Sequence, residues 1–199
     1  MSPSLFESKI MGMSEEKNGT NPEMERIMDR LYELGGDIIR SERFQRAKSV
    51  PHHGTTSVAK HSLAVAGHAL QLCERAEKIG KKVNTTDAVR AALLHDIGMT
   101  DEDVFQRVSF VKAYEHPIRS AEIAKNEFHA NDVQVRAIER HMWPVCITPP
   151  DSREGWIVLA ADKHCALAEV TGNTNPGGIL DGEAYLKKEP GGEKDSRDE

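Results

Sequence analysis

The sequence predicts an all-α protein, a compact bundle of about six or seven helices, and three observations support that prediction. Apolar residues recur at steps of three and four along nearly every ordered segment, which is the helical period. Capping residues and terminating glycines bracket these segments, and convincing strand alternation is absent. A chain of 199 residues, 38% of them hydrophobic, is long enough to build one substantial core.

The first predicted helical segment spans residues 21–47. Asn21 is a possible N-cap, and Pro22 falls in the first turn, where its missing backbone N–H costs nothing. The pair Gly35-Gly36 is expected to bend or split the segment, because glycine weakens a helix interior.

The remaining helices follow from the same period and the same stop signals. They are expected over residues 57–79, 85–97, 116–128, 131–142 and 149–172. The whole pattern predicts a flexible N-terminus over 1–20, a single domain over 21–186 and a disordered, charged tail over 187–199.

Composition restricts the classes of function. The formal net charge of −6 provides no basic surface for displacing the counterions of a nucleic acid, so no nucleic-acid partner is expected. No apolar run approaches the roughly 20 residues of a membrane helix, and no secretory signal is evident. Three cysteines without a CxxC pair indicate free thiols and a cytoplasmic location rather than a disulfide framework.

Histidine and aspartate residues recur within or beside apolar helical segments. The segment "AALLHDIG" ends in His95 and Asp96, and Asp162 lies within "IVLAADKHCALA". A buried carboxylate needs a partner or a cation, because an uncompensated buried charge is costly. The residues that could meet at one place are His61, His95, Asp96, His116, His141 and Asp162.

Imidazole and carboxylate ligands without thiolate suit iron, manganese, cobalt, nickel or zinc. Taken singly, each of these residues is more simply explained as a hydrogen-bonded core or surface residue. The other histidines are assigned no role in the site, being placed on helix flanks or in turns: His52, His68, His129 and His164.

The order His, His-Asp, His, His, Asp resembles the HD-domain superfamily of metal-dependent phosphohydrolases. The resemblance covers roughly residues 50–170 and includes "HGTTSVAKHSLAVAGHAL", "AALLHDIG", "YEHPIRSAEIAKNEF" and "IERHMWPVCITPPDSREGWIVLAADKHCALAE". Within the superfamily the chain is similar to small stand-alone bacterial proteins classed as predicted hydrolases, and to the HD-type diadenosine tetraphosphate hydrolases. It lacks the Gly-Tyr-Pro tripeptide of the cyclic-di-GMP branch.

The resemblance implies a first metal position with four ligands: His61, His95, Asp96 and Asp162. It implies a second position, bridged by Asp96 and completed by His116 and His141. Two divalent transition-metal ions per chain are therefore expected. The implied reaction is hydrolysis of a phosphoester or phosphoanhydride in a small, nucleotide-like substrate by water that the cations activate, with Asp96 orienting that water.

Three further residues are candidates for contact with the substrate. Lys163 adjoins Asp162, and Arg119 follows His116 by one turn, where a guanidinium could hold a phosphate. His53 could donate to the leaving group or could simply be a turn residue. Met142 is expected in the core, whereas Trp143 is equally compatible with the core and with an apolar wall against a base.

Two other functions fit the same ligands. The set also resembles that of the diiron oxygenases of the HD superfamily, which use O₂ and an organic substrate. A catalytically silent metal-binding domain is the third reading. The longer matching segments favour the hydrolase.

Overall fold

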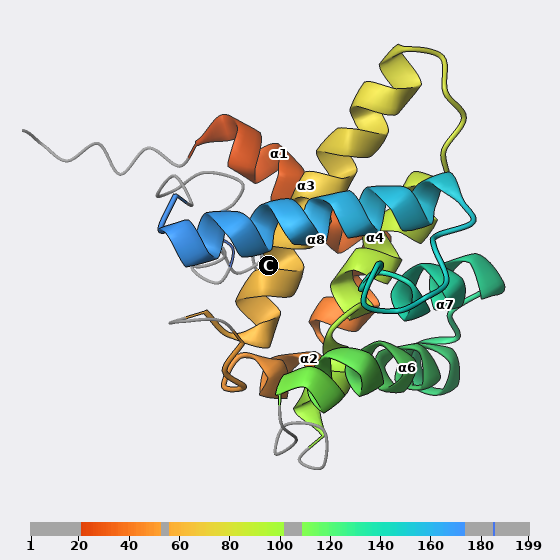
Figure 1. The fold of residues 1–199 in the computed structure, drawn as a ribbon. Helices are drawn as coiled ribbons and strands as arrows, with labels where there is room; N and C mark the ends of the chain where they lie inside the picture. Colours follow the sequence, from red (N-terminus) through yellow and green to blue (C-terminus); the bar gives the residue numbers. More distant parts are fainter. Residues whose placement is uncertain (1–20, 53–55, 102–108, 174–184, 186–199) are drawn as a thin grey trace, which may run out of the picture.

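The computed structural model describes residues 21–52, 56–101, 109–173 and 185, without the side chains of 109–113. These residues form seven α-helices, one short 3-10 helix and no strand, which confirms the all-α prediction (Figure 1). The elements are α1 (Pro22–Ile39), α2 (Glu42–Ala47), α3 (Val58–Lys78), α4 (Thr85–Leu94), η2 (Ile97–Thr100), α6 (Ser109–Phe128), α7 (Asp132–Glu139) and α8 (Arg153–Thr171).

The first helix follows the sequence pattern closely. The Asn21 side chain accepts a hydrogen bond from the Glu23 backbone N–H, and Pro22 occupies the first turn. The predicted bend is present, since Gly35 departs from helical geometry with φ −146° and ψ 24°. A Cβ at Gly35 would collide with the Leu93 side chain, so the glycine also permits close packing of α1 on α4.

The centre of the bundle is formed by α3, α4 and α8, which all contact one another. Figure 1 shows α8 crossing α3 and α4, with α6 and α7 packed together beside them. The residues buried between these helices are mainly alanine, valine, leucine and isoleucine. This arrangement brings the start of α3, the end of α4 and the middle of α8 into one region.

A buried polar clamp fixes α7 against α4. The Asp87 carboxylate, on α4, accepts hydrogen bonds of 2.7 Å from both the Asn131 and the Gln134 side-chain amides. Asn131 is also the N-cap of α7, since its side chain accepts from two backbone N–H groups of the first turn. The clamp therefore sets the position of the residues that follow α7.

Several predicted helix boundaries are wrong: α4 ends at Leu94 rather than at 97, and α8 begins at Arg153 rather than at 149. The helix expected from His116 begins at Ser109 instead, so His116 lies inside α6 and Pro117 is an interior proline. Packing of α6 on η2 compensates for the hydrogen bond that Pro117 cannot make, which illustrates how tertiary contacts override local propensity. The next helix, α7, ends at Glu139, so His141 follows the helix rather than completing it.

Several predictions fall outside the described residues. These are the flexible N-terminus at 1–20, the tail at 187–199 and the candidate residue His53. Among the described helices, none combines the length and the apolar character needed to cross a membrane.

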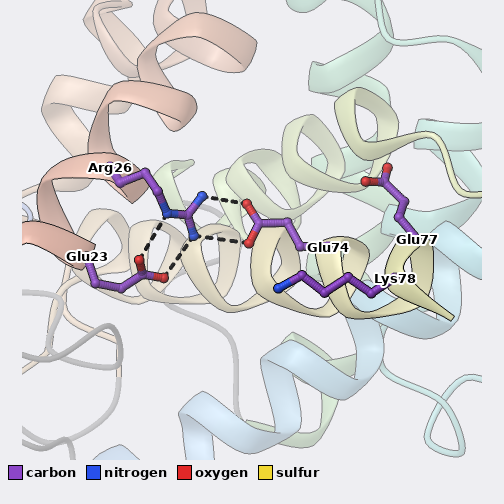
Figure 2. Close-up of a pocket in the computed structure, with 5 residues that line it drawn as sticks. All are labelled: Glu23, Arg26, Glu74, Glu77 and Lys78. Carbon is purple, nitrogen blue, oxygen red and sulfur yellow. Dashed lines mark hydrogen bonds and ion pairs between the residues drawn. The ribbon is translucent and has the colours of Figure 1, made fainter.

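A charged groove lies between α1 and α3. Figure 2 shows the Arg26 guanidinium reaching both Glu23, on its own helix, and Glu74, on α3. Glu77 and Lys78 line the rest of the groove. Its role is structural, because the Arg26–Glu74 pair links the two helices.

Replacing Gly67 by alanine is expected to destabilise the fold. Tyr185 is buried against α3, and a Cβ at Gly67 would collide with its hydroxyl group and lie 3.3 Å from Ile27 Cγ2. Overpacking of this kind costs about 1–3 kcal/mol, measurable as a lower free energy of unfolding in a urea titration. Gly36→Ala is the matched control, because its Cβ would meet only the flexible end of Arg40. Equal stability of the Gly67→Ala protein and the wild type would contradict the packing.

Candidate metal centre

The fold brings the six predicted ligand residues together. They come from five places: α3, the two residues that follow α4, the middle of α6, the residue two positions past α7, and the middle of α8. All six are buried, and none exposes more than 6% of its surface. They are His61, His95, Asp96, His116, His141 and Asp162.

The two oxygens of Asp96 face different groups of imidazoles. On the Oδ1 side, His116 Nε2 lies at 3.1 Å and His141 Nε2 at 3.5 Å. These two ring nitrogens are 3.2 Å from each other. Two ligands of one ion have a separation of this size when metal–nitrogen distances are about 2.0–2.1 Å.

On the Oδ2 side, Asp96 faces His95 Nε2 at 3.3 Å and His61 Nε2 at 3.9 Å. Asp162 Oδ1 completes this group, at 3.1 Å from His61 Nε2 and 3.8 Å from His95 Nε2. The ligand atoms of His61, His95 and Asp162 all lie within 4.8 Å of one another. Asp96 thus has nitrogen donors on both sides, and the ligand atoms of His95, Asp96 and His141 also lie within 4.8 Å of one another.

Hydrogen bonds from Nδ1 to backbone carbonyls orient two of the imidazoles. Nδ1 of His95 donates to the Ala92 carbonyl at 2.7 Å, and Nδ1 of His141 donates to the Ile138 carbonyl at 2.7 Å. Hydrogen bonds of this type fix which ring nitrogen is available to a metal. In both residues Nε2 is left facing the centre.

The inward atoms fit a cation. His95 Nε2 and Asp96 Oδ1 are buried without a partner in hydrogen-bonding geometry. Because His95 Nδ1 donates to the Ala92 carbonyl, the Nε2 of a neutral ring carries a lone pair, and it faces Asp96 Oδ2 at 3.3 Å; two facing lone pairs without a positive charge between them repel. A divalent ion would satisfy both atoms, so the donor set is suited to a transition metal.

The electrostatics of the centre also favour positive charge. Burial alone would raise the pKa of the Asp96 carboxyl, but the surrounding imidazoles, His95 foremost, hold that pKa well below its usual range. Burial lowers the pKa of His61, yet hydrogen bonds with Asp162 and Glu169 outweigh it and raise the pKa to about 10. Both shifts indicate a place that stabilises a cation.

Glu169 is a residue that the sequence analysis did not assign to the site. Both of its carboxylate oxygens accept from His61 Nδ1, at 3.0 and 3.1 Å, and its side chain is 5% exposed. It lies two helical turns beyond Asp162 on α8, and that seven-residue spacing was the available signal. Carboxylate, imidazole and metal in series are a common arrangement around bound ions.

Replacing Glu169 by glutamine is expected to weaken metal binding about 10–100-fold, because the imidazole of His61 loses its orienting carboxylate. Titration with Co²⁺ against a chelating indicator measures the change. Glu139→Gln, at an exposed position at the end of α7, is the control. Unchanged Co²⁺ affinity in the Glu169→Gln protein would show that the hydrogen bond does not support a ligand.

The sequence analysis assigned no role to His52, and the structure places its imidazole beside Asp96. Its Nε2 lies 2.7 Å from Asp96 Oδ2, and its side chain is only 6% exposed. His52 precedes α3 in a connecting segment, so no helical period could place it in the centre. The other three histidines stay outside: His68 and His164 stack on each other, and His129 is a turn residue with φ 53°.

Of the predicted substrate-binding residues that the structure describes, Lys163 lies beside the candidate ligands and Arg119 does not. Lys163 Nζ lies 2.9 Å from Asp162 Oδ2, at the edge of the centre, and its side chain is 45% exposed. Arg119 is engaged elsewhere, with its Nε at 2.6 Å from Asp101 and its Nη1 at 3.0 Å from Glu122. These ion pairs hold the guanidinium on the surface of α6, and no described contact joins it to the metal ligands.

The fold and the cluster define a class: helical domains with a buried histidine and aspartate centre suited to divalent metals. The family model of the HD domain matches residues 58–167, more than half of the chain, and the chain belongs to that family. HD domains are characteristic of metal-dependent phosphohydrolases. No curated protein and no solved structure matches the chain.

Proposed function

We propose that this protein is a metal-dependent phosphohydrolase acting on a phosphoester or phosphoanhydride bond of a small, nucleotide-like substrate. The observation that supports this most directly is the placement of Asp96. One oxygen faces His116 and the other faces His95, as a carboxylate bridging two ions would.

The two donor sets would form two metal positions. The first would be held by His61, His95, Asp162 and Asp96 Oδ2, and the second by His116, His141 and Asp96 Oδ1. Divalent ions bound there would make a water molecule acidic enough to attack near neutral pH and would polarise a phosphoryl oxygen.

The chain's own groups orient and bind. Asp96 would contribute one oxygen to each position, and both of its oxygens face imidazoles. Lys163, half-exposed beside Asp162, presents an ammonium group to solvent, where it would bind a nonbridging phosphate oxygen. The Lys163 ammonium also donates to the sulfur of Met142 at 3.5 Å.

The substrate class rests on chemistry at this edge and on the family resemblance. The half-exposed side chain of Lys163 would pair with the phosphate of a nucleotide. Mononucleotides and dinucleoside polyphosphates are both members of this class. The choice between them is open to a direct test.

The test combines metal analysis with a substrate panel. Protein purified without added metal is expected to hold about two transition-metal ions per chain, falling to about one in the His116→Ala, His141→Ala double variant. Phosphate release from nucleotides and dinucleoside polyphosphates is measured with Mn²⁺, Co²⁺ and Ni²⁺, with the double variant as the inactive comparison. Hydrolysis supported by these ions would establish the activity.

Three other results would contradict the proposal, each in a different way. Activity confined to the iron form and dependent on O₂ would replace the hydrolase by an oxygenase. Metal binding without turnover of any phosphorylated compound would indicate a silent metal-binding domain. Absence of metal even after reconstitution would overturn the proposal altogether.

A further inference from the structure

His52 is held in place by the backbone on both sides of it. The backbone N–H of His52 donates to the Thr56 carbonyl at 2.9 Å, and the backbone N–H of Val58 donates to the Val50 carbonyl at 2.9 Å. These bonds tie the segment before α3 to the first residues of that helix. The imidazole of His52 is therefore carried by a backbone with a defined position, although it belongs to a connecting segment.

The side chain is directed into the centre. Its ring stacks on that of His61, with centroids 4.2 Å apart and an interplanar angle of 20°. The two rings are stacked face to face. His52 Nε2 lies 2.7 Å and His61 Nε2 lies 3.9 Å from the same oxygen, Asp96 Oδ2. Ligand atoms of these three residues lie within 4.8 Å of one another.

We infer that His52 is a further ligand of the first metal position, which none of the sequence patterns assigned. The inference rests on the metal centre of the proposed function and not on the reaction. Three imidazoles converge on Asp96 Oδ2, whereas two converge on Oδ1. A divalent cation is the group that can satisfy several imidazole nitrogens and a carboxylate oxygen at once.

The donors are therefore divided unequally between the two positions. The first has five protein donors: His52, His61, His95, Asp162 and Asp96 Oδ2. The second has three: His116, His141 and Asp96 Oδ1. Positions rich in protein ligands are closed, and catalytic positions keep room for water and substrate. The second position is accordingly expected to keep room for water.

The alternative role for His52 is donation of a hydrogen bond to Asp96 alone. Substitution by glutamine separates the two roles, because its amide N–H can still donate to the carboxylate, whereas a neutral amide is a poor ligand for a transition metal. Substitution by alanine removes both functions. His68→Ala is the matched control, because His68 is also an imidazole on the outside of α3 and stacks on His164 instead.

The experiment is performed on the full chain loaded with Co²⁺. Visible absorption reports the ligands around the ion, and competition with a chelating indicator gives the affinity of each position. In the His52→Ala and His52→Gln proteins we expect a changed Co²⁺ spectrum and at least about tenfold weaker binding at one position. Added imidazole is expected to restore part of the spectrum in His52→Ala, and His68→Ala is expected to match the wild type.

The results that overturn the inference are specific. A wild-type spectrum and affinity in His52→Gln would assign His52 to hydrogen bonding, as would an unchanged spectrum in His52→Ala. The glutamine variant keeps the inference testable if the alanine variant fails to fold. Co²⁺ binding that depends on His52 in a protein without hydrolase activity would refute the proposed reaction and leave the ligand assignment intact.

Discussion

The Asp96→Asn protein is expected to lose both metal ions, because the two oxygens of this carboxylate face imidazoles of both donor sets. Asparagine keeps the size of the side chain but removes its charge and replaces one oxygen by an amide nitrogen, which offers no lone pair to a metal. Elemental analysis after gel filtration is expected to show well below one ion per chain, against about two in the wild type.

The control for this substitution is Asp37→Asn. Asp37 makes a similar charged contact, at 2.6 Å from Arg90, but its side chain is 59% exposed and joins α1 to α4. It should retain the wild-type metal content. Retention of about two ions by the Asp96→Asn protein would refute a bridging role, and retention of one would mean that Asp96 serves a single position.

The second large effect is expected from Gly98→Ala. A Cβ at this position would lie 2.7 Å from the Ser120 backbone nitrogen and 2.9 Å from the His116 carbonyl oxygen. Both atoms belong to the backbone of α6 and cannot rotate away. The Gly98 N–H also donates to Ser120 Oγ at 2.9 Å, so η2 and α6 are held in close contact at this point.

The added methyl group must therefore push α6 away from η2. Overpacking costs about 1–3 kcal/mol in the free energy of unfolding, measured by urea titration. Because His116 moves with α6, the second metal position should also be lost, and elemental analysis should give about one ion per chain. Lower stability with full metal content would mean that His116 keeps its place. The Gly36→Ala variant is again the comparison, since its added Cβ meets only a flexible side chain.

The helical architecture was accessible from the sequence because its signals are local. Asn21 and Pro22 mark the first helix, and Gly80, with φ 75°, follows the long third one. Apolar periodicity depends only on which residues are one turn apart, so it survives without knowledge of the fold. The start of α6 was missed because Pro117 is a strong local stop signal and packing on η2 overrides it.

The candidate site, like the helices, was predicted only in part from the sequence. The sequence already contained the unusual feature, carboxylates and imidazoles within apolar helical segments, and the physical cost of burying them unpaired singled out Asp162 and the His95-Asp96 doublet. Glu169 shares a face with Asp162, but an acidic residue on a helix is common and its contact with His61 crosses from α8 to α3.

By itself the sequence determined the helices, the order of the six predicted ligands and the chemistry of their donor atoms, because each depends on residue type and short-range spacing. Only the tertiary structure decided which atoms meet. Packing of α3, α4 and α8 divides the imidazoles between the two oxygens of Asp96 and brings His52 to one of them. It also pairs Arg119 with Asp101 instead of leaving it open to a phosphate. Distances between side chains on different elements are set by the whole core, and no short-range pattern contains them.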